Sequence, residues 1–252
     1  MRYLRLIRHL SNGWLYLAFK LGWVRRDPLV FRTRRGVVVE VPLRLLQTFK
    51  EIFMDECYLR GLGRAVPPRP VVIDVGANAG FFSLFAASRF PGAAVYAFEP
   101  MPSNFGQLSR NRDLNPSHDL TCLRQAVAGA SGLLTLTFDP ADDFTTNASM
   151  LAPGGPGGET IEVPSVTLAE VFSEHGLDRC DLIKMDCEGA EYDILYRCPD
   201  AVLARIDQMA LEVHPGGGPD QNIRALEAHL GERGFRTRRR PVGMLWAWRD
   251  RA

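Results

Sequence analysis

Two acidic residues and a glycine-rich turn lie at the ends of predicted strands in the first half of the chain. Asp74 lies in the apolar run VVIDV, and the turn GANAG, residues 76–80, comes directly after it. Glu99 follows a second predicted strand, 25 positions after Asp74. In nucleoside-binding sheets, an acid roughly 20 residues beyond the glycine turn accepts hydrogen bonds from the ribose hydroxyls. The glycine turn and the acid at this spacing therefore predict a nucleoside-binding site.

The residues around the turn favour a nucleoside that carries no phosphate. Dinucleotide sites use the spacing G-x-G-x-x-G, with the pyrophosphate on a helix N-terminus. Here the spacing is Asp-x-Gly-x-Asn-x-Gly, with no Lys or Arg nearby. We expect the carboxylate of Asp74 to be free to accept hydrogen bonds, Gly76 to permit a tight turn and Gly80 to let the backbone approach a ligand. A ligand with an ammonium group and a ribose suits this site, and S-adenosylmethionine has both.

Strands and helices alternate from residue 71 onward, which predicts an α/β fold with a doubly wound, mostly parallel sheet. We expect strands at 71–75, 93–98, 120–127, 181–185 and 206–213, with further strands at 36–41, 133–138 and 160–163. The expected helices are 43–59, 81–90, 103–114, 190–196 and 221–231. In such sheets, ligands bind beyond the carboxyl ends of the strands.

Four strings resemble, in this order, the FkbM-type family of S-adenosylmethionine-dependent methyltransferases: VIDVGANAGFFSLFAA, VYAFEPMPSNFGQL, DLIKMDCEGAEYDIL and LEVHP. They run from about Val71 to Pro215. The resemblance implies a class I methyltransferase (Rossmann-like) fold, with a seven-stranded sheet that ends in an antiparallel pair. It also implies methyl transfer to a hydroxyl oxygen, on a small-molecule, natural-product or glycan acceptor.

The resemblance further implies which residues hold the cofactor. The predicted cofactor-binding residues are Asp74, Gly76, Ala77, Asn78, Gly80, Phe98, Glu99, Pro100, Gln125, Ala126 and Asp186. The glycine turn would hold the methionine part, and Glu99 the ribose hydroxyls. Gln125 and Ala126 would lie by the adenine, at a place where many relatives of this fold carry an acid.

A second group of ionisable residues follows the predicted strands of the second half. Asp186 ends one strand, and Glu212 and His214 end the next. An acceptor hydroxyl must lose its proton, and a positioned base contributes about 10²–10⁴-fold to such a rate. The ordinary pKa of histidine, near 6.5, suits a base at neutral pH. We therefore predict His214 as the base, with Asp186 and Glu212 as further catalytic residues, whereas Glu188 and Glu191 open the next helix, where the dipole also favours acids.

A divalent cation is the alternative way to activate the hydroxyl. Two carboxylates and an imidazole hold Mg²⁺ or Mn²⁺ in many proteins, and Asp186, Glu212 and His214 would sit at adjacent strand ends. A bound cation lowers the pKa of a hydroxyl directly. No metal-ligand spacing motif surrounds these residues, so the base is the preferred hypothesis.

The first 35 residues are basic and amphipathic. Nine Lys and Arg stand against one acid, Asp27. Apolar residues at three- and four-residue steps mark one helical face: Leu6, Ile7, Leu10, Trp14, Leu17, Ala18 and Leu21. We expect this face to pack on the main domain, with peripheral contact between residues 1–35 and a membrane as the alternative. The predicted division is an N-terminal helical extension with short strands and a lead-in helix, residues 1–60, and a methyltransferase domain, residues 61–252.

The amino-acid composition argues against several classes of protein and partner. The chain has 252 residues, 46% of them hydrophobic, which is enough to bury a core without a staple. The 30 Lys and Arg nearly cancel the 29 Asp and Glu, which argues against a nucleic-acid partner. Five cysteines without a CxxC pair favour free thiols and a cytoplasmic protein. A nicotinamide-dependent oxidoreductase and a non-catalytic membrane-associated module stay open as alternatives, and the glycine-rich loop at 139–159 is a candidate lid.

Overall fold

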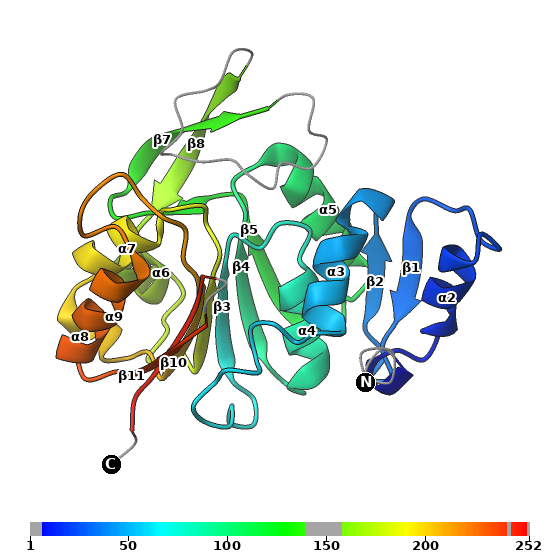
Figure 1. Cartoon of the computed structure of the whole chain (residues 1–252), viewed down its shortest axis with the longest axis horizontal. Helices are drawn as coiled ribbons and strands as arrows, with labels where there is room; N and C mark the ends of the chain where they lie inside the picture. The colour runs from blue at the N-terminus through cyan, green and yellow to red at the C-terminus, as the bar shows by residue number, and fades with distance from the viewer. Residues whose placement is uncertain (1–6, 140–157, 241–242, 251–252) are drawn as a thin grey trace.

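A sheet of seven strands forms the centre of the protein, in the order β11-β12-β10-β9-β3-β4-β5 (Figure 1). The computed structural model describes residues 7–139, 158–240 and 243–250. The parallel strands are β3 (Val71–Val75), β4 (Ala94–Phe98), β5 (Asp119–Leu123), β9 (Leu182–Met185) and β10 (Gln208–Glu212). Strand β12 (Met244–Trp248) is antiparallel to β10 and to β11 (Arg236–Arg239). The predicted mostly parallel sheet that ends in an antiparallel pair is confirmed.

Helices cover both faces of this sheet (Figure 1). On one face lie α4 (Phe81–Arg89) and α5 (Pro102–Asp113). On the other lie α6 (Leu168–Glu174), α7 (Glu191–Arg197), α8 (Asp200–Leu203) and α9 (Ile223–Glu232). Successive side chains along β3 serve the two faces in turn, because Val72 belongs to the buried cluster with α4 and Ile73 to the cluster with α7. This is why the strand is continuously apolar.

A second, three-stranded sheet extends beyond one end of the main sheet (Figure 1). Its strands are β6 (Ala126–Val127), β7 (Gly132–Phe138) and β8 (Glu159–Val166), in the order β6-β8-β7. The expected single strand at 120–127 is therefore two strands, β5 and β6, which belong to different sheets. Residues 140–157 of the candidate lid lie outside the described residues.

Two helices differ from the sequence prediction. The expected helix at 43–59 is a 3-10 turn, η1 (Leu43–Leu45), followed by the shorter α3 (Leu46–Phe53). Beyond α3 the backbone adopts a left-handed conformation at Glu56, with φ of 50°, so the chain turns before Tyr58. Helix α6 was not predicted, although the side chains of Thr167 and Glu170 form a capping box at its start.

The N-terminal segment is not one amphipathic helix. Leu10 forms a β-bridge with Thr33, and α2 (Trp14–Lys20) begins only after it. The strands β1 (Leu29–Arg32) and β2 (Val38–Val41) follow as an antiparallel pair. The expectation that the apolar face packs on the main domain is wrong for Ile7, Trp14, Leu17 and Leu21, which are exposed, whereas Leu10 and Ala18 are buried.

Other side chains of this segment do join the main core. Phe31 stacks on Phe49, and Phe53 packs edge-on against Phe85 of α4. One buried cluster thus runs through both parts of the chain, and the boundary expected between residues 60 and 61 stays a prediction. Within the described residues, no helix is long and apolar enough to cross a membrane.

Candidate functional site

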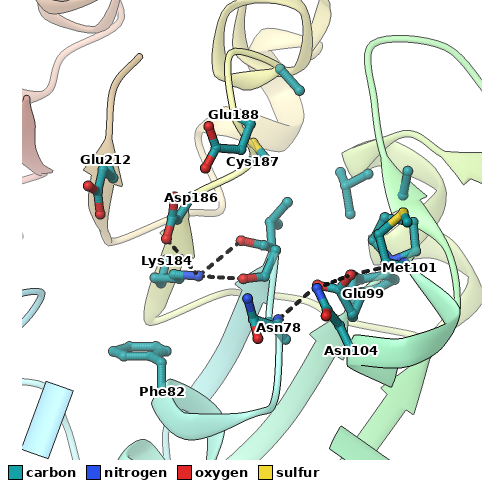
Figure 2. A pocket seen from close by; sticks show the side chains of 18 of the residues that line it. Asn78, Phe82, Glu99, Met101, Asn104, Lys184, Asp186, Cys187, Glu188 and Glu212 are labelled. Carbon is teal, nitrogen blue, oxygen red and sulfur yellow. Dashed lines mark hydrogen bonds and ion pairs between the residues drawn. The ribbon is translucent and has the colours of Figure 1, made fainter. Parts of the chain in front are cut away.

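A cavity lies at the carboxyl ends of β3, β4, β9 and β10, beside α3 and β7 (Figure 2). The predicted residues that line it are Gly76, Ala77, Asn78, Phe98, Glu99, Pro100, Ala126, Asp186, Glu212 and His214. Three further predicted residues, Asp74, Gly80 and Gln125, are not part of the lining. The topology therefore brings together groups from both halves of the chain, as the strand-end rule implies.

Glu99 forms one end of the cavity. Its Oε2 accepts a hydrogen bond from the N–H of Asn78 at 2.8 Å, and its Oε1 accepts one from the N–H of Met101 at 2.9 Å. Burial raises the pKa of Glu99 to about 7, against the lowering effect of these two hydrogen bonds. Asn78 reaches it in a left-handed conformation, with φ of 50°, which Asn tolerates better than most residues. Oε1 also accepts a long hydrogen bond from Nδ2 of Asn104 at 3.5 Å, whereas Oε2 keeps a lone pair for a ligand hydroxyl.

The carboxylate of Asp74 lies below the cavity in a buried ion pair. Its Oδ1 is 3.3 Å from Nζ of Lys184, and its Oδ2 accepts a hydrogen bond from Ser83 at 2.6 Å. The strand register explains the pair, because Asp74 of β3 stands directly opposite Lys184 of β9. The expectation of a free Asp74 carboxylate is wrong, since Lys184 neutralises it.

Lys184 connects the glycine turn with the far end of the cavity, and sequence reasoning missed it. Its Nζ donates to the carbonyl oxygen of Gly76 at 2.7 Å and lies 3.9 Å from Oδ2 of Asp186 (Figure 2). Burial alone would lower the pKa of Lys184, but the charges of Asp74 and Asp186 outweigh it and raise the pKa. Lys184 is therefore charged, and its charge is shared between two carboxylates.

Tyr58 is the second missed residue. Its hydroxyl lies 2.9 Å from Oδ2 of Asp186 and 3.2 Å from Oε2 of Glu212. The indole N–H of Trp246 donates to the backbone carbonyl of Tyr58 and fixes its place. Burial and the charge of Asp186 raise the pKa of Glu212. One phenol from the N-terminal segment thus joins two carboxylates that end neighbouring strands.

His214 lies between Glu188, in the β9–α7 connection, and Glu191, the first residue of α7. Its Nδ1 is 3.2 Å from Oε1 of Glu191, and its Nε2 is 3.6 Å from Oε2 of Glu188. The hydrogen bond with Glu191 and the charge of Glu188 raise the pKa of His214 to about 9. Burial raises the pKa of Glu188 to about 7. The expected ordinary histidine pKa is therefore wrong, and His214 is protonated at neutral pH.

The group that could hold a metal also differs from the predicted one. Asp186, Glu188 and His214 each offer a ligand atom, and these atoms lie within 4.8 Å of one another. Glu212, expected in this place, is not a member of this group. Two carboxylates and an imidazole are a donor set that Mg²⁺ or Mn²⁺ accepts.

The two glycines of the turn have packing reasons for their identity. Gly76 has φ of +72°, and a Cβ there would lie 1.9 Å from the carbonyl oxygen of Asp186. Gly80 has φ of +81°, and its Cβ would lie 2.5 Å from Cδ1 of Leu108 in α5. Gly80 therefore allows two helices to approach rather than the backbone to approach a ligand. Gln125 lies between β5 and β6, where its neighbour Ala126 reaches the cavity and it does not.

Comparisons with known proteins find relatives along most of the chain. The family model described as the methyltransferase FkbM domain matches residues 74–237. The 31-O-demethyl-FK506 methyltransferase FkbM of Streptomyces tacrolimicus is 35% identical in an alignment 206 residues long, which covers 71% of this chain and 78% of the relative. The methyltransferase sdnD of Sordaria araneosa is 30% identical, over 74% of this chain and 80% of the relative. The hexuronic acid methyltransferase AglP of Haloferax volcanii is 26% identical, over 85% of this chain and 86% of the relative. The matched family region contains Lys184 and Asp186 but begins after Tyr58.

Proposed function

The chain belongs to the FkbM methyltransferase family, and from this premise we propose that it is an S-adenosylmethionine-dependent O-methyltransferase. We propose further that it acts on a hydroxyl group of a small-molecule, natural-product or glycan acceptor. Because the chain belongs to a methyltransferase family, we no longer consider the alternative of a nicotinamide-dependent oxidoreductase. The cytoplasmic location stays a prediction.

The observation that carries this proposal is the two-ended cavity (Figure 2). Glu99 and Asn104 lie at one end, Glu188 and Glu212 lie at the other, and Lys184 lies between them. A carboxylate with spare acceptor capacity suits ribose hydroxyls at the first end. A group of acids suits a cationic sulfonium and an acceptor hydroxyl at the second end.

The lining residues fit the chemical parts of the cofactor. Glu99 would accept hydrogen bonds from the ribose, and the apolar side chains of Leu134 and Leu136 from β7 would enclose the adenine near Ala126. Asp186 would face the cationic part. When bound, S-adenosylmethionine would supply a methyl group on a sulfonium, from which a neutral thioether leaves readily. Asp74 would act indirectly, by holding Lys184 and through it the carbonyl of Gly76.

At the acceptor end, His214 is the proposed base, with Asp186 and Glu212 as the groups that orient the hydroxyl. The acids around His214 keep it protonated in the free protein, because they stabilise the imidazolium. A positive charge bound beside Asp186 and Glu188 would oppose that stabilisation and lower the pKa of His214. The imidazole would then accept the proton of the hydroxyl at Nε2, while Glu191 holds Nδ1.

Activation by Mg²⁺ or Mn²⁺ remains the second hypothesis, with Asp186, Glu188 and His214 as ligands. The position of Lys184 favours the base, because its ammonium lies 3.9 Å from Asp186 and repels a divalent cation there more strongly than a singly charged sulfonium. Chelation separates the two hypotheses, since only the metal hypothesis predicts loss of activity.

The charge of the site also restricts the acceptor. Asp186, Glu188 and Glu212 would repel a phosphorylated substrate, so a neutral hydroxyl compound fits best. The printed name of one relative, a 31-O-demethyl-FK506 methyltransferase, supports methyl transfer to an oxygen.

Methyl transfer from labelled S-adenosylmethionine to a panel of neutral sugars, uronic acids and natural-product alcohols tests the proposal. We expect label in a methyl ether, which survives mild alkali. Label released by mild alkali would indicate a methyl ester, and label on nitrogen an amine, and either would contradict O-methylation of a hydroxyl. Incubation with NAD instead of S-adenosylmethionine is the control.

A further inference from the structure

The N-terminal segment carries most of the large apolar side chains that the protein exposes. Among the described residues eight such side chains are exposed, and six of them lie between residues 7 and 30. These six are Ile7, Trp14, Leu17, Leu21, Trp23 and Val30. Single exposed apolar side chains are ordinary, but a cluster marks a surface that binds something.

Four of these side chains form one patch on and beside α2. Trp14, Leu17 and Leu21 follow each other at steps of three and four residues, which places them on one helical face. Tyr16 and Ala18 occupy the inner face and are buried. The N–H of Trp23 donates to the carbonyl of Ala18 at 2.9 Å, so Trp23 folds back next to the helix.

This apolar patch is open to solvent. Trp14 is 63% exposed, Leu21 61% and Trp23 78%. Helix α2 lies at the end of the molecule opposite α8 and α9, away from the second half of the sheet (Figure 1). The patch is also separate from the cavity, because none of its residues lines that cavity.

Exposed basic residues adjoin the apolar patch along the chain. Lys20, Arg25 and Arg26 are exposed next to it along the chain. The single acid of the first 35 residues, Asp27, accepts a hydrogen bond from the N–H of Leu43. In the same segment, Arg8, Arg34 and Arg35 line a small depression with Arg89 of α4, and no acid lines it.

We propose that this surface docks on an anionic phospholipid bilayer. Tryptophan rings favour the boundary between headgroups and acyl chains, and arginine and lysine bind the phosphate groups beside it. The charge also argues against a second copy of this chain as the occupant. A twofold contact through the patch would bring two sets of the basic residues Lys20, Arg25 and Arg26 into one interface.

Sedimentation with vesicles tests the proposal on the full chain. We expect binding to vesicles of equal parts phosphatidylcholine and phosphatidylglycerol, weak binding to phosphatidylcholine alone, and release at high salt. The double variant Trp14→Ser, Trp23→Ser should bind at least about tenfold more weakly. Its matched control is Leu114→Ser, Leu133→Ser, which removes two exposed apolar side chains elsewhere and should bind as the wild type does.

A second pair of variants tests the charge. Arg25→Glu, Arg26→Glu should weaken binding by about tenfold or more, because each basic side chain near the lipid surface contributes several-fold. Arg124→Glu, Arg224→Glu makes the same change at exposed positions outside the segment and should have little effect. Calorimetric titration with S-adenosylmethionine should be unchanged in all four variants, which shows that each is folded.

Three results would overturn the proposal. The first is no binding to the mixed vesicles, and the second is equal loss in the patch variants and their controls. The third is a wild-type dimer in light scattering that becomes a monomer when Trp14 and Trp23 are replaced, which would assign the patch to a second copy. None of them bears on the methyltransferase proposal, which depends on the cavity.

Discussion

Lys184 and Asp74 stand opposite each other on β9 and β3, with Nζ 3.3 Å from Oδ1, and both side chains are almost completely buried. The small residues Ala97 and Ala210 occupy the same register on the neighbouring strands. The pair fixes the strand ends from which Gly76 and Asp186 reach the cavity. Asp74 therefore serves the site as part of its support.

Lys184→Met should destabilise the protein strongly. The substitution leaves the carboxylate of Asp74 buried without its counter-charge, and loss of one partner of a buried pair costs about 3–5 kcal/mol. Urea denaturation measures the free energy of unfolding. The control is Arg197→Met, which breaks the exposed pair with Asp193 and should cost less than about 1 kcal/mol. Equal losses in both variants would contradict the supporting role of the buried pair.

Tyr58→Phe should lower turnover while S-adenosylmethionine still binds. The phenyl ring keeps its packing against Phe82, but the hydrogen bonds to Asp186 and Glu212 are lost. Since the hydroxyl lowers the pKa of Glu212, its removal should raise that pKa and move the acidic limb of kcat to higher pH. We expect about a 10–100-fold lower kcat, on the scale of a lost charge-assisted hydrogen bond. Unchanged kcat and pH profile would remove Tyr58 from the catalytic machinery.

The sequence predicted the fold well, because continuously apolar strands that alternate with helices are typical of a parallel sheet covered on both faces. Its failures at the site share one cause, which is that they depend on contacts between distant segments. Asp74 and Lys184 each interrupt an apolar strand, and this was a usable signal, since buried charges of opposite sign tend to pair. Tyr58 gave no such signal, because only the turn after α3 brings it to strands β9 and β10.

The affinity for S-adenosylmethionine should rise with pH near neutrality. The pKa of Glu99 is about 7 in the free protein, so its carboxyl is partly protonated there. Ribose hydroxyls donate best to the ionised form, so binding should release protons and strengthen from pH 6 to pH 8. Calorimetry in buffers of different ionisation enthalpy measures both effects. Glu99→Gln should bind weakly with a flatter pH dependence, and an equally steep dependence in this variant would contradict the role of Glu99.

The raised pKa of Glu99 also predicts how the free energy of unfolding depends on pH. Between about 4.5 and 7 the folded protein holds a proton on Glu99 that the unfolded chain has lost. The contribution of Glu99 to the free energy of unfolding is therefore fully present below pH 4.5. It decreases as the pH rises from 4.5 to about 7. Denaturation of the wild type and of Glu99→Gln across this range should give a shallower slope for the variant. A parallel pair of curves would refute the raised pKa.

His214→Gln should remove the pH dependence that belongs to the base. For the wild type, kcat/KM should rise with pH toward an apparent pKa near 9, because this parameter reports the free enzyme. The corresponding rise of kcat with pH should occur at lower pH, because the sulfonium of the bound cofactor opposes protonation of His214. Treatment with a chelator should leave both profiles unchanged. Loss of activity with the chelator and its recovery with Mg²⁺ would instead support the metal bound by Asp186, Glu188 and His214.

A crystal structure with S-adenosylhomocysteine, the stable product, tests the central claim most directly. We predict that the ribose hydroxyls lie within hydrogen-bond distance of Glu99 and that the sulfur faces Asp186, with His214 beyond it. The adenine should lie against Leu134 and Leu136. A ligand that binds outside this cavity, or with its sulfur directed away from Asp186, would contradict the account.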